Sequence, residues 1–322
     1  MRALVISNML PDAAHPERGR FVRDQVAALR ALTGPTEGLE VELFEFSPGA
    51  RALAAAARVL RRRYRGEGFD VVHAHFGLTA WPALAVRARV RGLTVHGTDV
   101  RHPRTRQATR AVLPLMDLVA AASPELAGEL PGRSARRRAR VLPCGVDVER
   151  FHPLPRARAR AELGLDPDRP CVLFPADPAR PEKRFDRAQA LMEAAAGAAE
   201  LLTLGGVPPE RVPLWINAAN AVVVPSEREG FGLAVLEALA CEVPVLATPV
   251  GVHRQALEGI DGTLCAPFEL TRWGAALEPH LGPDRRIKGR ERAERFSARR
   301  MAAALAQEWH TLLHEHDGVR GG

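Results

Sequence analysis

Short apolar runs alternate with longer amphipathic runs along the whole chain. In the first half, the runs that we predict to be strands are Ala3–Ser7, Glu40–Glu45, Val71–Ala74, Leu93–His96, Leu118–Ala121 and Arg140–Leu142. Amphipathic helices are predicted between them, for example at Phe21–Leu32 and Ala52–Arg63. Apolar strands separated by helices are typical of a parallel sheet that is covered on both faces.

The same pattern starts again after a proline-rich stretch at residues 153–170. This stretch has prolines at both ends of one short predicted helix, which indicates an interdomain connection. The strands predicted beyond it are Cys171–Pro175, Leu201–Leu204, Ala221–Val224, Val243–Ala247 and Thr263–Cys265. Helices are predicted at Arg184–Ala196, Glu210–Asn217, Phe231–Cys241 and, as the last element, Ala298–His314.

The pattern predicts an α/β fold with two doubly wound parallel-sheet domains, Rossmann-like in topology, that face each other across a cleft. We expect one domain at residues 1–153, a second at 154–297, and a C-terminal helix at 298–322 that packs back toward the N-terminal domain. Ligands of such sheets bind beyond the carboxyl ends of the strands. Candidate functional residues are therefore expected in the loops that follow strands.

Composition places the chain among ordinary globular proteins. Its 322 residues, 46% hydrophobic and 26% charged, allow two full hydrophobic cores. The four cysteines form no CxxC pair, so free thiols in a reducing compartment are expected. No apolar stretch approaches the roughly 20 residues of a transmembrane helix, and the N-terminus lacks the features of a secretory signal. These observations predict a cytoplasmic protein, or one peripheral at the inner face of the membrane.

The segment Ser226–Ala238 carries the strongest chemical signal. A predicted strand ends just before it, and a predicted helix begins within it. The glycines of this turn have no side chains that would block a ligand, and the first helical turn offers free N–H groups and the positive end of the helix dipole. The segment therefore indicates an anion site suited to a diphosphate, and its predicted donor-binding residues are Gly230, Phe231, Gly232 and Leu233.

Two carboxylates, Glu229 and Glu237, flank this helix entry. They are separated by about 10–12 Å along the helix axis, which is too far for an acid and base that act on one bond. They suit the two ends of a long ligand with phosphates between them, with Glu229 at sugar hydroxyls and Glu237 at ribose hydroxyls. The alternative is an ordinary glycine-rich turn before a helix with a solvated glutamate, and the strand–turn–helix context favours the site.

Residues Glu229–Ala240, followed by Pro244-Val245 and Val250-Gly251, resemble the signature of glycosyltransferase family 4. Members of this family are retaining enzymes of the GT-B fold. Other segments that resemble the family, in the expected order, are Asn8–Pro11, Gly19–Gln25, Asp70–His75, Val95–Asp99 and Pro143–Asp147. The stretch between Leu204 and Ala221 has room for little more than one helix, where family members carry a further strand–helix unit. The chain thus resembles a short variant of the family.

The resemblance implies an N-terminal acceptor domain, a C-terminal nucleotide-sugar domain, and roles for residues in other loops. Arg180 and Lys183 match a basic pair that stabilises the departing nucleoside diphosphate, where fixed cations oppose the growing negative charge. His96 is implied near the donor sugar or the reacting centre, and Asp99 at an acceptor hydroxyl or at His96. Gly19 is implied in donor binding. The predicted catalytic set is Arg180, Lys183, His96 and Glu229.

No metal or other cofactor is expected. His73 and His75 end another strand and point to the same side of it, but no carboxylate cluster accompanies them, so a structural role is favoured over metal binding. Asp166-Pro167-Asp168 formally matches the DxD of metal-dependent transferases of a different fold. Its proline-rich setting predicts a turn instead.

The leading hypothesis is a hexosyltransferase-like enzyme, of class EC 2.4. It would move a sugar from a UDP- or GDP-sugar to an acceptor hydroxyl with retention, in cell-surface polysaccharide or glycolipid synthesis. Its expected partners are the nucleotide sugar and a sugar or lipid-linked acceptor. A sugar phosphorylase or an epimerase of the same fold is the alternative. A non-catalytic nucleic-acid-binding protein, suggested by the net charge of +7, is disfavoured because only 5% of the residues are aromatic.

Two arginine clusters leave two interpretations open. Arg61–Arg63, with Arg58 and Arg65, ends one predicted helix, and the second cluster lies at Arg133–Arg140. Either cluster could rest on anionic lipid head groups. Both could equally be solvated faces of a chain whose basic residues are almost all arginine.

Overall fold

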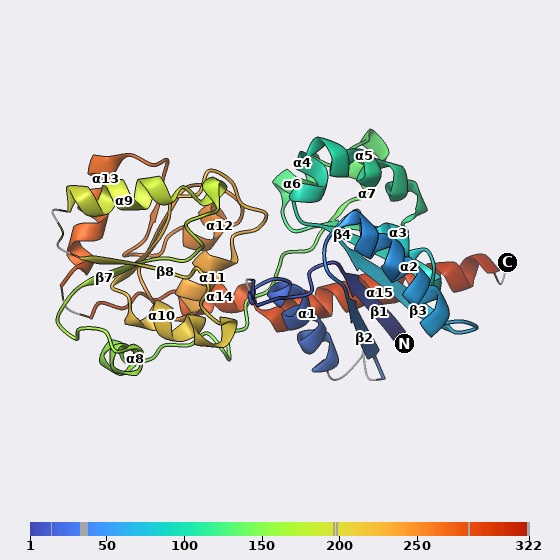
Figure 1. Ribbon diagram of the computed structural model, residues 1–322, viewed down its shortest axis with the longest axis horizontal. Coiled ribbons are helices and arrows are strands. Elements are labelled where there is room, and N and C mark those ends of the chain that lie inside the picture. The colour runs from blue at the N-terminus through green and yellow to red at the C-terminus, as the bar shows by residue number, and fades with distance from the viewer. Residues whose placement is uncertain (14, 33–37, 196, 198, 283, 321–322) are drawn as a thin grey trace. The chain divides into compact units, whose positions relative to one another are not determined.

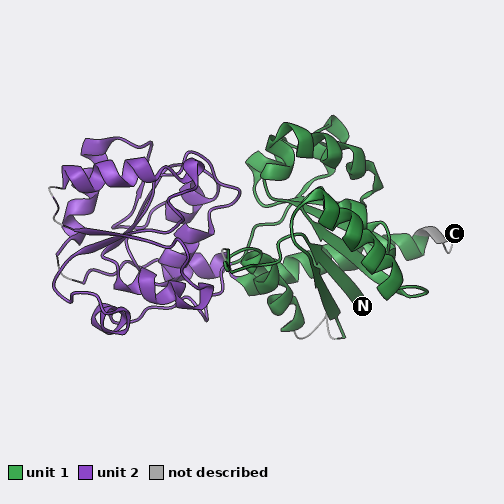
Figure 2. Cartoon of the chain, viewed as in Figure 1, with its two compact units in different colours: residues 1–145, 298–322 green, residues 146–297 purple. Residues whose placement is uncertain are grey.

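The computed structural model describes residues 1–322 apart from 14, 33–37, 196, 198, 283 and 321–322. The chain divides into two compact units (Figure 2). Unit 1 comprises residues 1–145 and 298–322, and unit 2 comprises residues 146–297. Each unit is built on one parallel sheet with helices on both faces, which confirms the predicted α/β class.

Unit 1 contains a sheet with the strand order β2-β1-β3-β4-β5-β6, in which all described pairs are parallel. The strands are β1 (Arg2–Ser7), β2 (Glu40–Glu45), β3 (Gly68–His75), β4 (Arg87–Val95), β5 (Leu118–Ala121) and β6 (Arg140–Val141). The helices are α1 (Arg20–Arg30), α2 (Ala50–Arg63), α3 (Ala80–Ala83), α4 (Thr98–Arg101), α5 (Pro103–Val112), α6 (Pro124–Gly128), α7 (Arg133–Arg138) and α15 (Ala298–Arg320), with a 3₁₀ turn η1 (Leu113–Leu115).

One hydrophobic core of unit 1 lies between the sheet and helices α1 and α15. It combines alternate strand residues such as Ala3 and Val5 with Val26 of α1 and Trp309 of α15. Apolar residues three and four apart on a helix form a stripe that must find an apolar partner, and here the sheet supplies it. Helix α15 thus belongs to the fold of unit 1 although it ends the chain (Figure 1).

Unit 2 contains a sheet with the strand order β11-β10-β9-β7-β8, again parallel. Its strands are β7 (Cys171–Phe174), β8 (Glu200–Thr203), β9 (Ala221–Val224), β10 (Val245–Ala247) and β11 (Leu264–Cys265). Its helices are α8 (Arg156–Leu163), α9 (Phe185–Ala194), α10 (Val212–Ala218), α11 (Leu233–Ala240), α12 (His253–Leu257), α13 (Leu270–Leu277) and α14 (Arg290–Arg295), with 3₁₀ turns η2 (Pro181–Lys183), η3 (Pro209–Arg211) and η4 (Glu278–His280).

The core of unit 2 on one face of the sheet is closed by α9 and α13. Leu191 of α9 and Trp273 of α13 pack with Phe174 and Val223 of the strands. Helices α10, α11 and α14 lie on the other face (Figure 1). Between β8 and β9 only η3 and α10 are present among the described residues, as the spacing predicted.

The boundary between the units falls between Gly145 and Val146, earlier than the predicted position after residue 153. The physical reason is a backbone pairing within unit 2. Val146 forms a parallel bridge with Ser297, and its N–H donates to Phe296 O at 2.9 Å. Residues 146–153 are therefore held in the second unit.

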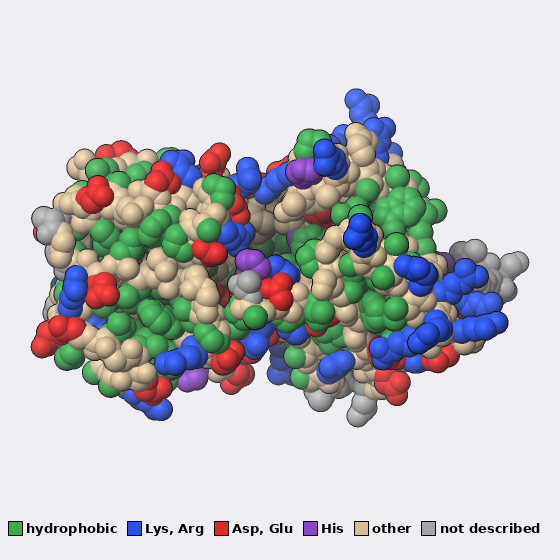
Figure 3. All heavy atoms as spheres, viewed as in Figure 1, with side chains coloured by type: hydrophobic (Ala, Val, Ile, Leu, Met, Phe, Trp, Pro, Cys, Tyr) green, Lys and Arg blue, Asp and Glu red, His purple; other side chains and the backbone are tan. Residues whose placement is uncertain are grey.

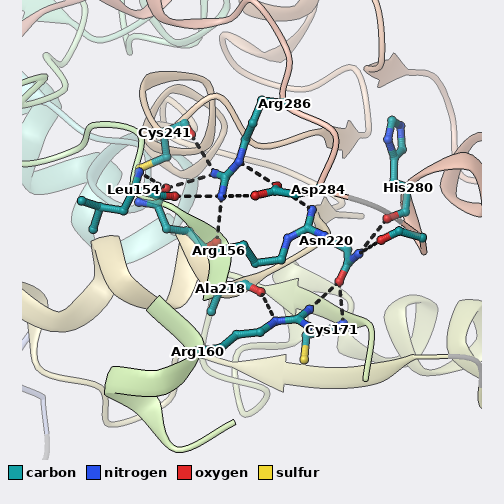
Figure 4. A network of polar contacts seen from close by, with 12 residues as sticks. Leu154, Arg156, Arg160, Cys171, Ala218, Asn220, Cys241, His280, Asp284 and Arg286 are labelled. Carbon is teal, nitrogen blue, oxygen red and sulfur yellow. Dashed lines mark hydrogen bonds and ion pairs between the residues drawn. The ribbon is translucent and has the colours of Figure 1, made fainter. Parts of the chain in front are cut away.

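The proline-rich stretch 153–170 is also an integral part of unit 2, not the interdomain connection that was predicted. Its helix α8 is tied to the sheet by arginines (Figure 4). Arg160 donates to Asn220 Oδ1 at 2.7 Å, and Asn220 also receives the Cys171 N–H at the start of β7. Arg156 pairs with Asp284 at 3.1 Å. Because Arg156, Arg160 and Asn220 are buried, their contacts fix α8 against the amino ends of the strands.

In both sheets the strand order reverses next to the first strand of the unit. In unit 1 the reversal lies between β1 and β3, and in unit 2 between β7 and β9. The crevice at the carboxyl ends of such neighbouring strands is where open α/β sheets bind ligands. Among the described helices, none is long and apolar enough to cross a bilayer.

Candidate active site

Two loops of unit 2 leave the carboxyl ends of β7 and β9 at the point where the strand order reverses. The first carries Arg180 and Lys183, and the second carries Ser226 and Glu229. The Glu227 N–H donates to the carbonyl of Glu182 at 2.9 Å, so the backbones of the two loops are joined. The fold therefore brings together two of the segments that the sequence singled out.

Lys183 and Glu229 form a buried ion pair at this junction. Lys183 Nζ lies 2.8 Å from Glu229 Oε1 and 2.7 Å from Oε2. Their side chains are only 15% and 8% exposed. Ser226 Oγ also donates to Glu229 Oε1 at 2.8 Å. The carboxylate is thus held from two sides, and the sequence had not predicted that these two residues bind each other.

Charge and burial oppose each other in setting the pKa of Glu229. Burial raises the pKa of this carboxyl, but the Lys183 charge, a smaller effect of His253, and the hydrogen bonds from Lys183 and Ser226 outweigh it. The net result is a pKa below the ordinary value. Glu229 is therefore ionised at neutral pH, and it in turn keeps the ammonium of Lys183 in place.

Helix α11 begins beside this pair without a side-chain cap. Its N-cap residue Gly232 has a φ of 103°, a left-handed backbone that favours glycine, and glycine has no side chain with which to cap the first-turn N–H groups. A Cβ at this position would lie 2.4 Å from His253 Nε2. The helix entry is thus open for an anion on one side and closed by His253 on the other.

His253 is a site residue that the sequence did not indicate. Its Nδ1 lies 2.9 Å from the carbonyl of Thr248, so neutral His253 donates from Nδ1. Its Nε2 is buried and has no partner in the described part of the chain. Burial lowers the pKa of His253, although the charge of Glu229 works in the opposite direction. Its nearest sequence signal is Val250-Gly251 of the family resemblance, and only the tertiary contact with Gly232 shows that His253 belongs to the site.

Substituting Gly232 by alanine is expected to destabilise the protein by roughly 1–3 kcal/mol, because the new Cβ would be strained and would collide with His253. Any ligand seated on α11 should also lose at least about tenfold in affinity, because the helix entry must shift. Gly259→Ala is the matched control: Gly259 has a φ of 71° but no atom near a new Cβ. Denaturation and ligand titration of both variants test this. Equal losses for the two would contradict the role of Gly232.

The remaining predicted residues of unit 2 take different positions. Arg180 has a 56% exposed side chain and binds Glu182 at 2.7 Å, so it does not join the Lys183–Glu229 pair. Phe231 is buried, and its carbonyl accepts the Val252 N–H at 2.8 Å. Gly230, Leu233 and Glu237 are half-buried along the α11 entry and its first turns.

In unit 1, the predicted residues His96 and Asp99 lie together in the loop after β4. The buried carboxylate of Asp99 accepts the N–H groups of His96 at 3.0 Å and of Gly97 at 2.9 Å, and Gly77 donates to it at 3.2 Å. Burial raises the pKa of Asp99, and these backbone hydrogen bonds partly oppose the rise. Asp99 was predicted to bind either His96 or an acceptor hydroxyl. The structure shows a contact with the backbone N–H of His96, and the role toward an acceptor hydroxyl stays a prediction.

Gly19 occupies the N-cap of α1, in the loop that follows β1. Its φ is 69°, and a Cβ there would lie 2.4 Å from the carbonyl of Met9. Glycine is therefore required by the close approach of two backbones. Phe21, two residues later, brings its ring to 4.7 Å from that of His96. The β1 loop and the β4 loop thus meet at one end of the unit 1 sheet.

The two histidines at the end of β3 are fully buried. His73 binds Thr94 Oγ1 at 2.7 Å, and its ring lies 5.4 Å from that of His75. Among the described residues, no group of three or more histidine, cysteine or acidic side chains is placed to hold a metal ion. Asp166 Oδ1 accepts the N–H groups of Asp168 and Arg169, which confirms the turn predicted here.

Two family profiles match the chain. The profile described as Glycosyltransferase Family 4 matches residues 16–150, and the one described as Glycosyl transferases group 1 matches residues 166–281. A D-inositol 3-phosphate glycosyltransferase of Nocardia farcinica is 31% identical over 97% of this chain and 80% of its own length. A protein of the same name from Actinosynnema mirum is 33% identical over 84% of this chain and 76% of its own.

Solved structures of glycosyltransferases are similar in fold. A sucrose-phosphate synthase from Thermosynechococcus elongatus matches with a TM-score of 0.72 and 20% identity, over 98% of this chain and all of that chain. Anabaena HepE, solved in complex with UDP, matches with a TM-score of 0.65 and 16% identity, over 97% of this chain and 100% of that chain. At these identities the likeness concerns the fold.

Proposed function

Because the chain belongs to the family 4 glycosyltransferases, which have the GT-B fold, we propose that it moves a hexose-type sugar from a UDP- or GDP-sugar to an acceptor hydroxyl with retention of configuration. Membership of the family establishes that the protein is a glycosyltransferase. The donor, the stereochemistry and the acceptor are the proposed part, together with a role in cell-surface polysaccharide or glycolipid synthesis.

One observation supports the donor site above all: the Lys183–Glu229 pair lies beside the uncapped entry of α11. An ammonium has three N–H donors, and the carboxylate takes two of them. The third can bind a phosphate oxygen, while the N–H groups of the first α11 turn bind the other phosphate. We assign the diphosphate to this place, with the sugar toward Glu229 and the ribose toward Glu237.

The contacts of the Glu229 carboxylate with Lys183 and Ser226 support transfer without a covalent intermediate on this residue. A carboxylate that already binds Lys183 and Ser226 is a poor nucleophile, since both of its oxygens are engaged. Charge stabilisation of the departing diphosphate by Lys183 then supplies most of the catalysis, with the acceptor attacking from the face that the diphosphate leaves. Arg180 is proposed to turn toward the diphosphate when the donor binds, since its side chain is exposed and, among the described residues, binds Glu182 alone.

The relatives suggest one acceptor to test first. Their printed name is D-inositol 3-phosphate glycosyltransferase, so a phosphorylated cyclic polyol belongs in the acceptor panel beside simple sugars. On the acceptor side we place His96, whose ring is held in unit 1, and Asp99, which fixes the backbone around it. No metal or other cofactor enters the proposed reaction.

The proposal is tested by a transfer assay with UDP-, GDP- and ADP-sugars against inositol 3-phosphate, monosaccharides and lipid-linked sugars. We expect one donor class to be consumed in the presence of an acceptor, with an α-linked product from an α-donor in the NMR spectrum. A β-linked product would rule out retention. Use of orthophosphate as acceptor, or an isomerised sugar without transfer, would instead identify a phosphorylase or an epimerase.

The proposal also includes contact with anionic membranes through the end of α2. Arg61, Arg62 and Arg63 are exposed there, next to Val59, which is 49% exposed. On the face drawn in Figure 3, basic side chains gather over this end of unit 1. In the second cluster, by contrast, Arg136 and Arg138 donate to backbone carbonyls of the preceding segments, so they serve the fold.

Vesicle co-sedimentation tests this contact. The protein is expected to bind vesicles with phosphatidylserine at low salt and to be released as the salt rises, because each surface arginine contributes about 1 kcal/mol that salt screens. The triple variant R61E/R62E/R63E should lose binding. R158E/R254E/R295E, with the same charge change at exposed positions of unit 2, should retain most of it. No wild-type binding to anionic vesicles would end the membrane proposal.

A further inference from the structure

Two histidines at neighbouring strand ends of unit 1 share one hydrogen atom. His75 Nδ1, at the end of β3, lies 2.9 Å from His96 Nε2, directly after β4. The ring centroids are 5.1 Å apart and the ring planes differ by 20°. The two rings therefore meet edge to edge, as in an N–H···N hydrogen bond, and one nitrogen must donate while the other accepts.

The outer nitrogen of His75 distinguishes between the two arrangements. His75 is fully buried, and its Nε2 has no hydrogen-bond partner within the described residues. If His96 donated, neutral His75 would carry its proton on Nε2 and bury an N–H group without an acceptor. If His75 donates from Nδ1, only a lone pair is left unpaired. In folded proteins, a buried N–H group without an acceptor is rarer than a buried acceptor atom without a donor. His75 is therefore the donor.

All three histidines of this region are neutral at physiological pH. Burial lowers the pKa of His73 and of His96 to about 3. The pKa of His75 is well below its ordinary value, through burial first and then the nearby His96 and His73. For His73 the proton position follows from its partners. Trp309 Nε1, which can only donate, lies 3.2 Å from His73 Nδ1, so His73 carries its proton on Nε2 and donates to Thr94.

The arrangement fixes what His96 can offer to a ligand. Because its Nε2 accepts from His75, neutral His96 carries its proton on Nδ1. That nitrogen has no hydrogen-bond partner in the described part of the chain, and the His96 side chain is half-buried, unlike those of His73 and His75. The rings of Phe21 and Phe76, each centred 4.7 Å from that of His96, hold the imidazole in place. Phe76 adopts a φ of 74°, a strained backbone for a non-glycine residue, directly after His75.

We infer that His75 is a positioning residue: by donating its Nδ1–H to His96 Nε2, it locks His96 in the tautomer that presents Nδ1–H to an oxygen of the sugar substrates. The inference rests on the proposed function, in which His96 lies at the reacting centre. The opposite tautomer would present a lone pair instead. A hydroxyl that must be bound as an acceptor, or a sugar ring oxygen, would then lose its donor.

The experiment is NMR of the full-length protein labelled with ¹⁵N-histidine, with the His96 signals identified by their loss in H96N. In the wild type, the long-range ¹H–¹⁵N spectrum should show His96 protonated on Nδ1. In H75N, the asparagine amide replaces the donor at the position of Nδ1, so the tautomer should persist. In H75L the hydrogen bond that fixes the tautomer is lost, and a form of His96 protonated on Nε2, absent from the wild type, should become detectable.

Turnover should follow the tautomer. H75L is expected to lower kcat about tenfold, the effect of one lost hydrogen bond, with little change in the KM for the donor. H75N should restore kcat to within about threefold of the wild type. H73Q is the matched control: it alters an equally buried histidine two residues earlier and should leave the His96 tautomer unchanged. If H75L does not fold, the spectra of H75N and of the wild type still show which nitrogen of His96 is protonated.

Protonation of His96 on Nε2 in the wild type would overturn the inference, as would the absence of any Nε2-protonated His96 in folded H75L. The spectra require no turnover, so they are judged separately from the proposed function. Failure of every sugar nucleotide in the transfer assay would refute the proposed function, and with it the substrate-facing role of His96. The assignment of the shared hydrogen would still stand or fall on the spectra alone.

Discussion

Replacing Lys183 by alanine is expected to lower turnover by about 10²–10³-fold, with a much smaller effect on donor binding. Removal of one fixed group that stabilises transition-state charge has an effect of this size. Lys183 is buried beside Glu229 at the entry of α11, where a departing diphosphate would develop its negative charge. Lys288→Ala is the natural control, because Lys288 is the only other lysine of the chain and is exposed.

The same substitution leaves the Glu229 carboxylate buried without its cation, so we expect K183A to lose about 3 kcal/mol of stability as well. The double variant K183M/E229Q separates the two effects. It removes both charges together and should recover much of the stability, yet it should remain as slow as K183A. Recovery of turnover in the double variant, or full turnover in K183A, would show that Lys183 serves only to neutralise Glu229.

Acidification is expected to destabilise unit 1 strongly. The pKa of His73 in the folded protein is about 3, against an ordinary value of 6.5, because the ring is fully buried. The unfolded chain therefore binds this proton more tightly than the folded protein does. The contribution of neutral His73 to the free energy of unfolding is complete above about pH 7. It is lost as the pH falls toward the pKa that His73 has in the folded protein. At pH 5, His73 alone lowers the free energy of unfolding by about 2 kcal/mol, and His75 and His96 add to this.

Urea denaturation at pH 7.5, 6 and 5 measures this dependence. In H73Q, the loss of stability between pH 7.5 and 5 should be smaller than in the wild type by about 2 kcal/mol. H15Q is the control, since the His15 side chain is 48% exposed. The comparison uses the slope with pH, so a general destabilisation by the substitution does not affect it. Equal slopes in the wild type and H73Q would contradict a neutral, buried His73.

The alternation of apolar and amphipathic runs was enough to predict both sheets. Strand β7, for example, was predicted at Cys171–Pro175 and is found at Cys171–Phe174. Helix α5 was not predicted, because its sequence has no apolar stripe and only Thr109 and Val112 are buried. The first half of β4 was missed for a similar reason: its arginines alternate with apolar residues. In the described pairings this half bonds β3, whereas β5 joins β4 from Gly92 onward, and Arg89 pairs with Asp70 instead of entering a core.

Residue types that carry chemistry could be picked out from the sequence, but their mutual contacts could not. Lys183 and Glu229 were each predicted as ligands of the donor, yet 46 residues separate them, and only the pairing of β7 with β9 brings their loops together. His253 was not indicated at all, because its role depends on the missing side chain of Gly232. His75 was interpreted as structural, and its bond to His96 depends on β3 lying beside β4.

The central claim is that unit 2 binds a nucleoside diphosphate at the α11 entry, and thermal unfolding with UDP, GDP, ADP and their sugars tests it most directly. One nucleotide should raise the Tm of the wild type by roughly 5–10 °C at 100 times its Kd. Glu237→Ala should reduce this shift, whereas Glu258→Ala, at an exposed position of the same unit, should not. A protein that none of these nucleotides or nucleotide sugars stabilises would contradict the claim.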